Sequence, residues 1–238
     1  MNRIVTMVLK NAFLVPGAWG KLCRYAKHPE KYEEKEMYGF IRDILLRGIR
    51  SGNIHIISSG QENLPKEGGF MLYGNHQGMF DPLAVVATCQ RPLGVVMKKE
   101  LYNIPFIHQV ARCTKSFAMD REDVRQSLTV IQQVTTEVKS GRAYLIFPEG
   151  TRSRLGNEMV DFHSGSFRCA LRSKCPIVPM ALIDCFKVLD QQGSAPVSVQ
   201  IHYLKPIPWE EYKDLSTTEI AALVKSRIAE KIQAVTAE

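Results

Sequence analysis

The sequence predicts one α/β domain built on a mixed, largely parallel sheet with helices on both faces. From Ile54 onward, short apolar or β-branched runs alternate with stretches of helical periodicity, as in folds with a parallel sheet. The run "AYLIF" at 143–147 is apolar throughout, which is typical of a strand buried on both faces. A length of 238 residues suits one sizeable core better than two.

The individual elements follow from periodicity and turn residues. Helices are predicted from residue 1 to about 50, with a break at Pro16-Gly17 and a second helix from about Glu33 to Arg50. Strands are predicted at 54–57, 69–73, 94–98, 116–120, 143–147, 176–183 and 197–204. Further helices are predicted at 124–138, around 164–173 and at 217–235. We therefore divide the chain into an N-terminal helical segment, 1–50, and the α/β domain, 51–238.

The basic charge is concentrated at the N-terminus. The net charge is +7, which favours a negatively charged partner, and no acidic residue precedes Glu30. Apolar and aromatic residues are interleaved there with Arg3, Lys10, Lys21, Arg24 and Lys27. Lys10 interrupts the apolar run, which stays short of the roughly 18 residues that span a bilayer. Residues 1–29 are therefore predicted to lie in the membrane interface; the alternative is a helix packed on its own domain.

Polar residues follow four of the predicted strands. His76 follows the second, Lys98 and Lys99 end or follow the third, Arg121 follows the fourth and Glu149 follows "AYLIF". In open α/β sheets, ligands bind beyond the carboxyl ends of the strands. If these strands are parallel, one histidine, one glutamate and several cations meet at one edge of the sheet.

The stretch "YGNHQGMFDP" places His76 five residues before Asp81. This offset puts the two side chains on different sides of a helix and on opposite faces of a strand, so only a turn brings them together. Asp81 followed by Pro82 is typical of a helix N-cap. Asp81 therefore either only caps a helix or also accepts the imidazole N–H, leaving the other nitrogen as a general base.

The stretch "FPEGTRSR" at 147–154 suits an anionic ligand. Gly150 lets backbone N–H groups approach a ligand closely. Arg152 and Arg154 can grip a phosphate, and Glu149 among these cations is expected to be ionised, binding a hydroxyl or orienting an arginine. The alternative is a polar turn that contains a salt bridge.

Several other chemistries are excluded. "GAWGKL" has the wrong spacing for a P-loop, no G-x-G-x-x-G follows a strand and no G-x-S-x-G elbow is present. The sequence has neither H-E-x-x-H nor a Cys/His cluster, so no metal is predicted. The six cysteines are scattered and are interpreted as reduced thiols. Nucleic acid is not a predicted partner, because the cations gather at strand ends beside a His–Asp pair.

Taken together, four stretches resemble the glycerolipid acyltransferase family, in particular its bacterial 1-acylglycerol-3-phosphate acyltransferases. The family's N-H-x-x-x-x-D block resembles Asn75-His76 to Asp81, and its lysine-leucine stretch leading to Asp-Arg resembles "KKELYNIPFIHQ" and "MDR". F-P-E-G-T-R-S is present in full at 147–153, and "PIVPMAL" resembles the fourth block. Gly78 stands where many members carry serine, a position that the His–Asp pair does not require.

The resemblance implies a glycerol-3-phosphate acyltransferase-like fold, preceded by an N-terminal helix pair resting on the membrane. It implies that His76 is the general base and Asp81 its orienting carboxylate. The acceptor-binding residues that it implies are Lys98, Lys99, Arg121, Glu149, Gly150, Thr151 and Arg152. Lys98 or Lys99 is alternatively expected near the developing oxyanion.

The implied reaction is acyl transfer from acyl-CoA or acyl carrier protein to the sn-2 hydroxyl of lysophosphatidic acid, giving phosphatidic acid. The thioester is the co-substrate and no cofactor is expected. The implied location is the cytoplasmic face of the cell membrane, as a peripheral or monotopic protein. The alternatives are another acceptor (glycerol-3-phosphate, another lysophospholipid or a lyso-aminolipid) and, from a different class, a non-catalytic membrane-binding protein.

Overall fold

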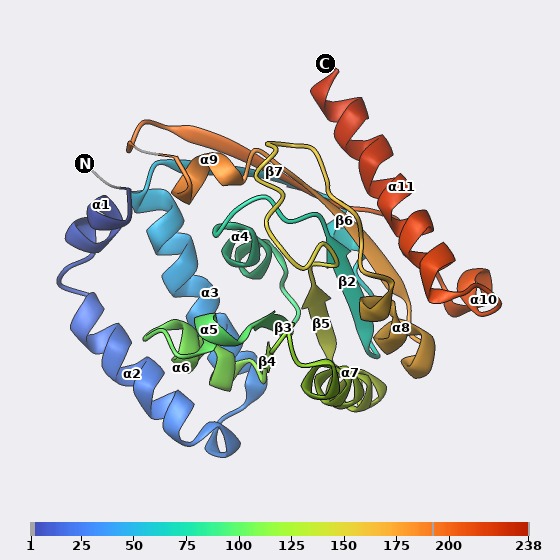
Figure 1. The fold of residues 1–238 in the computed structure, drawn as a ribbon. Helices are drawn as coiled ribbons and strands as arrows, with labels where there is room; N and C mark the ends of the chain where they lie inside the picture. Colours follow the sequence, from blue (N-terminus) through green and yellow to red (C-terminus); the bar gives the residue numbers. More distant parts are fainter. Residues whose placement is uncertain (1–2, 192, 238) are drawn as a thin grey trace.

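The computed structural model describes residues 3–191 and 193–237, and its centre is a seven-stranded sheet with the order β1-β7-β6-β2-β5-β3-β4 (Figure 1). Strands β2 to β6 are mutually parallel, whereas β1 and β7 pair in parallel with each other and run opposite to the rest. The predicted mixed, largely parallel sheet is confirmed. The strands are β1 (Ile54–Ser59), β2 (Phe70–Gly74), β3 (Leu93–Lys98), β4 (Phe117–Met119), β5 (Ala143–Ile146), β6 (Ile177–Ile183) and β7 (Val197–Tyr203).

Helices cover both faces of this sheet, as predicted (Figure 1). Every residue of the central strands β2, β5 and β6 is buried, because alternate side chains enter two separate cores. Leu72 packs in one core and its neighbour Tyr73 in the other. The first core is closed by α3 (Glu34–Ser51) and α4 (Asp81–Thr88), the second by α7 (Val124–Lys139), α8 (Arg168–Ser173) and α11 (Thr217–Thr236).

The N-terminal break lies earlier than the sequence predicts. Helix α1 (Arg3–Lys10) ends well before Pro16, and α2 (Val15–Lys27) begins one residue before it. Pro16 therefore stands in the first turn of α2, where its missing N–H costs no helical hydrogen bond. The chain turns at residues 11–14 instead, which corrects the prediction of a break at Pro16-Gly17.

The remaining helices are too short for periodicity to reveal them. They are α5 (Lys99–Tyr102), α6 (Ile107–Cys113), α9 (Phe186–Leu189) and α10 (Trp209–Tyr212), and none exceeds seven residues. The predicted helix around 164–173 divides into a 3-10 turn, Ser164–Phe167, and α8. Two other 3-10 turns lie at Pro29–Lys31 and Gln61–Asn63. All six cysteines are free.

Helix α1 is fixed to the domain by a buried arginine. Arg3 donates to three carbonyls, with Nε 3.1 Å from Val188 O, one terminal nitrogen 2.7 Å from Gly52 O and the other 2.8 Å from Ala195 O. Burial of the guanidinium lowers the pKa of Arg3. Helix α2 buries Leu22 and Tyr25 in the same core as the strands. The division of the chain into an N-terminal helical segment, 1–50, and the α/β domain, 51–238, stays a prediction.

The outer surfaces of α1 and α2 are apolar. Eight large hydrophobic side chains there are at least 40% exposed, and Phe13 is fully exposed: Ile4, Val5, Val8, Leu9, Phe13, Leu14, Val15 and Trp19. We call these eight residues the N-terminal apolar surface. Within the part of the chain that the structure describes, no helix is long and apolar enough to cross a membrane.

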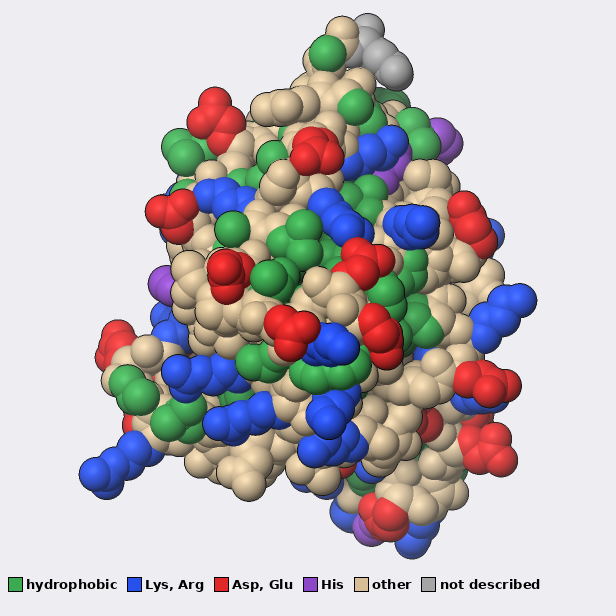
Figure 2. Space-filling model, turned by 90° about the vertical axis from the view of Figure 1, so that its right-hand side faces the viewer, with side chains coloured by type: hydrophobic (Ala, Val, Ile, Leu, Met, Phe, Trp, Pro, Cys, Tyr) green, Lys and Arg blue, Asp and Glu red, His purple; other side chains and the backbone are tan. Residues whose placement is uncertain are grey.

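The side of the molecule formed by α10 and α11 has a different character. Figure 2 shows this side, where hydrophobic side chains lie between charges of both signs. Ion pairs join Lys225 to Asp161 at 2.8 Å and Arg227 to Glu211 at 3.2 Å. Such an interspersed surface is ordinary for a face in contact with water.

Candidate active site

The residues predicted to bind substrate all lie at one edge of the sheet. The carboxyl ends of β2, β5, β3 and β4 follow one another there, in that order. With neighbouring strands about 4.8 Å apart, residues after β2 and β5 are adjacent, whereas those after β3 and β4 lie about 10 to 15 Å from β2. The structure therefore brings His76 and the 147–154 segment together and places Lys98, Lys99 and Arg121 further along the edge.

His76 and Asp81 form a hydrogen-bonded pair across the turn between β2 and α4. His76 Nδ1 lies 2.7 Å from Asp81 Oδ2. The imidazole stacks on the Phe147 ring, with centroids 4.3 Å apart and planes 16° apart, and its side chain is 16% exposed. The carboxylate accepts the hydrogen that Nδ1 donates, so the lone pair of the neutral ring lies on Nε2. Nε2 has no hydrogen-bond partner among the described residues. Nε2 is thus available as a proton acceptor.

Asp81 does not cap the helix, contrary to the prediction. Phe80 is the N-cap of α4, and Asp81 is the first helical residue. Its Oδ2 also accepts the backbone N–H of Gln77 at 2.6 Å and of Gly78 at 2.9 Å, so the carboxylate closes the turn that carries His76. Oδ1 is buried and has no partner among the described residues. One oxygen therefore performs both the turn-closing and the imidazole-orienting roles.

Glu149 links two loops through backbone hydrogen bonds. Its Oε1 accepts the N–H of His76 at 2.7 Å, and its Oε2 accepts the N–H of Val160 at 3.0 Å. The residue is 1% exposed, and this burial raises the pKa of its carboxyl group. The surrounding cations thus do not dominate its ionisation. Both carboxylate oxygens of Glu149 therefore accept backbone N–H groups of the protein. The backbone of His76 is thus held by a residue that follows β5.

Gly150 adopts a conformation that favours glycine. Its φ is +66°, and a Cβ atom at this position would lie 2.8 Å from Cδ2 of His163. The backbone N–H groups of the next two residues, Thr151 and Arg152, have no partner within the described part of the chain. Thr151 itself is exposed. The turn after β5 therefore presents two free donors next to the His76 loop, whose own carbonyl accepts the N–H of Ser153 at 2.9 Å.

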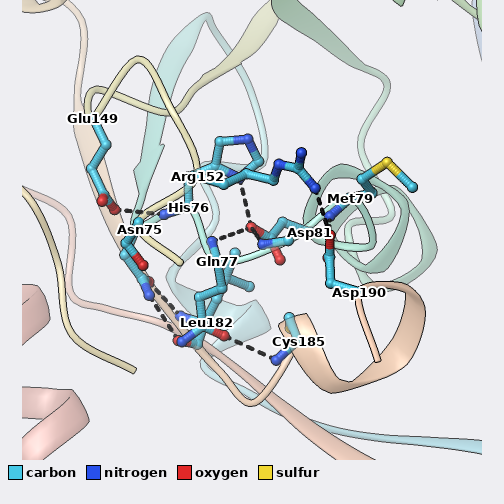
Figure 3. A network of polar contacts seen from close by, with 12 residues as sticks. Asn75, His76, Gln77, Met79, Asp81, Glu149, Arg152, Leu182, Cys185 and Asp190 are labelled. Carbon is cyan, nitrogen blue, oxygen red and sulfur yellow. Dashed lines mark hydrogen bonds and ion pairs between the residues drawn. The ribbon is translucent and has the colours of Figure 1, made fainter. Parts of the chain in front are cut away.

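Arg152 is held by Asp190, a residue that follows α9. One terminal nitrogen of Arg152 lies 2.5 Å from Asp190 Oδ1, and Oδ2 of the same carboxylate accepts the N–H of Met79 at 3.0 Å (Figure 3). Nε and the second terminal nitrogen of Arg152 have no partner among residues 3–191 and 193–237. Arg152 thus keeps two donor groups for an anion such as phosphate.

Lys98, Lys99 and Arg121 are exposed, and the two lysines are paired with acids. Lys98 lies 3.1 Å from Glu100 Oε1, and Lys99 lies 2.5 Å from Asp120 Oδ2. The hydrogen bond to Asp120 raises the pKa of Lys99. Arg121 is exposed next to this pair. These residues add positive charge along the edge without contacting the His76–Asp81 pair.

Three buried or half-buried amide side chains that sequence reasoning did not assign to the site hold its loops together. The Asn75 side chain bonds both the N–H and the carbonyl of Leu182 in β6, at 2.7 and 2.9 Å. Gln77 donates to Asn157 Oδ1 at 2.7 Å and accepts the N–H of Cys185 at 2.9 Å. Figure 3 shows the Asn75–Leu182 and Gln77–Cys185 contacts beside the His76 turn. The one signal in the sequence is that two polar amides flank His76 directly after a buried strand.

The described part of the chain contains no group of three or more His, Cys, Asp or Glu side chains that could hold a metal ion. The chemistry that this site offers is proton transfer at His76 beside a place for an anion. Such a combination suits a reaction in which a hydroxyl on an anionic molecule becomes a nucleophile.

Comparison with known proteins agrees with this geometry. A family model described as "Acyltransferase" matches residues 55–183. The 1-acyl-sn-glycerol-3-phosphate acyltransferase of Borreliella burgdorferi is 28% identical over 184 residues, which are 76% of this chain and 73% of that protein. The protein of the same name from Escherichia coli K12 is 30% identical over 166 residues, covering 69% of this chain and 67% of its own length.

A solved structure has the same fold. It is the crystal structure of the 1-acyl-sn-glycerophosphate acyltransferase PlsC from Thermotoga maritima, which superposes with a TM-score of 0.81 over 99% of this chain and 97% of that one. At 19% identity this likeness establishes the fold. Together with the family match over more than half of the sequence, it leads to one conclusion: the chain belongs to the acyltransferase family of enzymes.

Proposed function

We propose that the protein transfers an acyl chain from an acyl thioester to the free sn-2 hydroxyl of lysophosphatidic acid, giving phosphatidic acid. The observation that carries the proposal is the His76–Asp81 pair beside Arg152, which offers a base and a phosphate ligand in one place. The relatives that carry the name 1-acyl-sn-glycerol-3-phosphate acyltransferase support the same acceptor. Acyl-CoA and acyl carrier protein are the candidate donors, and no cofactor is required.

In this mechanism Nε2 of His76 removes the proton from the acceptor hydroxyl. The alkoxide oxygen forms a bond to the thioester carbonyl carbon, and the resulting tetrahedral intermediate collapses with loss of the thiolate. The thiolate receives the proton back from His76, so the enzyme returns to its starting state without an acyl-enzyme. Asp81 stabilises the transient imidazolium through the 2.7 Å contact with Nδ1.

Arg152 and the free N–H groups of Thr151 and Arg152 are assigned to the acceptor phosphate. A guanidinium with two free donors matches phosphate geometry, and backbone N–H groups add to it without side-chain entropy. Lys98, Lys99 and Arg121 draw the anionic acceptor toward the edge of the sheet through their charge. Glu149, whose oxygens are both engaged by backbone, is assigned to positioning the His76 loop.

A panel of acceptors tests this proposal. Lysophosphatidic acid, glycerol-3-phosphate, other lysophospholipids and a lyso-aminolipid are each supplied with acyl-CoA or acyl carrier protein thioester. Product forms with lysophosphatidic acid if the proposal is right, and His76→Ala abolishes it while His28→Ala, at the residue that precedes the 3-10 turn Pro29–Lys31, does not. If product forms only with another acceptor, that acceptor is the substrate instead. If no product forms with any acceptor, a non-catalytic protein is favoured.

We further propose that the N-terminal apolar surface rests in the membrane interface, on the cytoplasmic face. Exposed Lys10, Lys21, Arg24 and Lys27 belong to the same two helices as most of its apolar side chains, a combination that suits anionic lipid. Deleting residues 1–29 would remove core residues such as Leu22, so substitution is the better test. Phe13→Asp should reduce flotation with anionic vesicles, whereas Val124→Asp, at a 71% exposed residue on α7, should not. Equal flotation of both variants would contradict the proposal.

A further inference from the structure

The carboxylate of Asp190 stands between the two halves of the candidate active site. Its Oδ1 lies 2.5 Å from a terminal nitrogen of Arg152, in the loop after β5. Its Oδ2 lies 3.0 Å from the backbone nitrogen of Met79, in the turn between His76 and Asp81. A single side chain from a third segment thus contacts both the loop that carries the base and the arginine (Figure 3).

We infer that Asp190 is a positioning residue, which fixes the Arg152 guanidinium relative to His76 and so sets where the acceptor phosphate binds. This inference rests on the proposed function, because it assigns Arg152 to that phosphate. Arg152 carries a long side chain that is 31% exposed and would otherwise sample many rotamers. The ion pair restricts it while leaving Nε and one terminal nitrogen for the ligand.

Gly78 provides the space that this arrangement needs. A Cβ atom at Gly78 would lie 2.9 Å from Cα of Phe186, the first residue of α9, and still closer to Asp190 Oδ2. The φ of Gly78 is not positive, so the requirement is one of space rather than of backbone conformation. The glycine in the His76 turn and the aspartate after α9 therefore form one fitted contact.

The segment that carries Asp190 is itself anchored. The N–H of Asp190 bonds Phe186 O at 3.2 Å, and Val188 in α9 is completely buried. From the other side, Nε of Arg3 donates to Val188 O at 3.1 Å. A positioning side chain on a fixed element can hold its partner to within a fraction of an ångström.

Loss of Asp190 should therefore act on the acceptor and not on the thioester. In Asp190→Ala, Arg152 is free to leave the productive geometry, and the N–H of Met79 loses its acceptor. We expect the KM for lysophosphatidic acid to rise about tenfold and the KM for the acyl donor to stay within about twofold. Glu211→Ala, which removes the ion pair with Arg227 between α10 and α11, is the matched control and should change neither.

A double-mutant cycle separates positioning from general damage. If Asp190 acts through Arg152, then Asp190→Ala has little further effect on the acceptor KM once Arg152 is alanine. Gly78→Ala pushes on the same carboxylate. It should raise the acceptor KM as Asp190→Ala does when Arg152 is present, and it should have little effect on the acceptor KM when Arg152 is alanine. Thermal unfolding of each variant identifies any that is not folded, and the remaining variant then completes the cycle.

The outcomes distinguish this inference from the proposed function. Absence of acyl transfer to lysophosphatidic acid by the unmodified protein overturns the function itself. An active protein in which the effects of Asp190→Ala and Arg152→Ala on the acceptor KM multiply independently overturns the inference alone. A change in donor KM equal to the change in acceptor KM overturns it as well, because it indicates a general structural role. Non-multiplicative effects confined to the acceptor support it.

Discussion

Replacing Asp81 with asparagine removes the negative charge beside His76 while the side chain keeps its size. The amide oxygen can still accept the three N–H groups that now reach Oδ2, from the imidazole and from the backbone of Gln77 and Gly78. The amide nitrogen then takes the place of Oδ1, which has no partner among the described residues. The variant should fold, with a free energy of unfolding about 1 to 3 kcal/mol lower because a buried donor is unsatisfied.

The rate should fall because the imidazolium formed in the transition state loses its counter-charge. With charge centres about 4 Å apart and an effective dielectric constant of about 20, the lost attraction is about 4 kcal/mol, or about 10³-fold in kcat. Asp81 is fully buried and His76 is 16% exposed, so solvent screens this pair little. The KM for the acceptor should stay within about twofold, since the charge pair exists only after proton transfer.

Initial rates of acyl transfer, measured beside thermal unfolding, give both quantities. Asp161→Asn is the control, because it removes one charge from a fully exposed carboxylate paired with Lys225. Its kcat should be unchanged. A folded Asp81→Asn protein that loses less than about tenfold in kcat would refute the claim that this carboxylate stabilises an imidazolium.

Two further predictions concern the loop after β5. Glu149→Gln should remove a pH dependence of stability. Burial raises the pKa of the Glu149 carboxyl in the folded state, so the wild-type free energy of unfolding falls as pH rises from the unfolded-state pKa through the folded-state pKa. The free energy of unfolding of the variant, measured with urea, should not show this fall. Gly150→Ala and Gly141→Ala both place a Cβ at positive φ, and each should cost about 1 to 2 kcal/mol of stability. Only Gly150→Ala should also lower kcat, because its Cβ would press on the His163 ring. A Cβ at Gly141 has no atom within 4 Å, so Gly141→Ala is the control. Equal kcat values for the two variants would contradict this prediction.

The sequence was sufficient for the arrangement of the sheet edge. A continuous apolar run such as "AYLIF" is typical of a strand buried on both faces at the centre of a largely parallel sheet. Residues that directly follow such strands, including His76 and Glu149, then lie at the carboxyl-terminal edge of the sheet whatever conformation the loops adopt. The five-residue offset required a turn but left open whether Asp81 only caps a helix; the resemblance to the acyltransferase family is what implied its pairing with His76.

Contacts between loops could not be predicted in the same way. Asp190 reaches Arg152 only because α9 packs against Gly78, and a four-residue helix leaves no periodic signal. Glu149 was expected to respond to neighbouring cations, whereas its burial and two backbone N–H groups determine its environment. Both outcomes depend on where distant segments meet, which local sequence patterns do not encode.

The three carbonyls bound by Arg3 have a consequence for orientation at a bilayer. A helix on a loose tether would let the domain tilt and swivel freely above the lipid. Arg3 instead fastens α1 to the end of α3, to α9 and to the segment before β7. The proposed interfacial surface and the sheet edge with His76 thus turn as one body, so docking would fix both the height of the site and the direction in which it faces the bilayer.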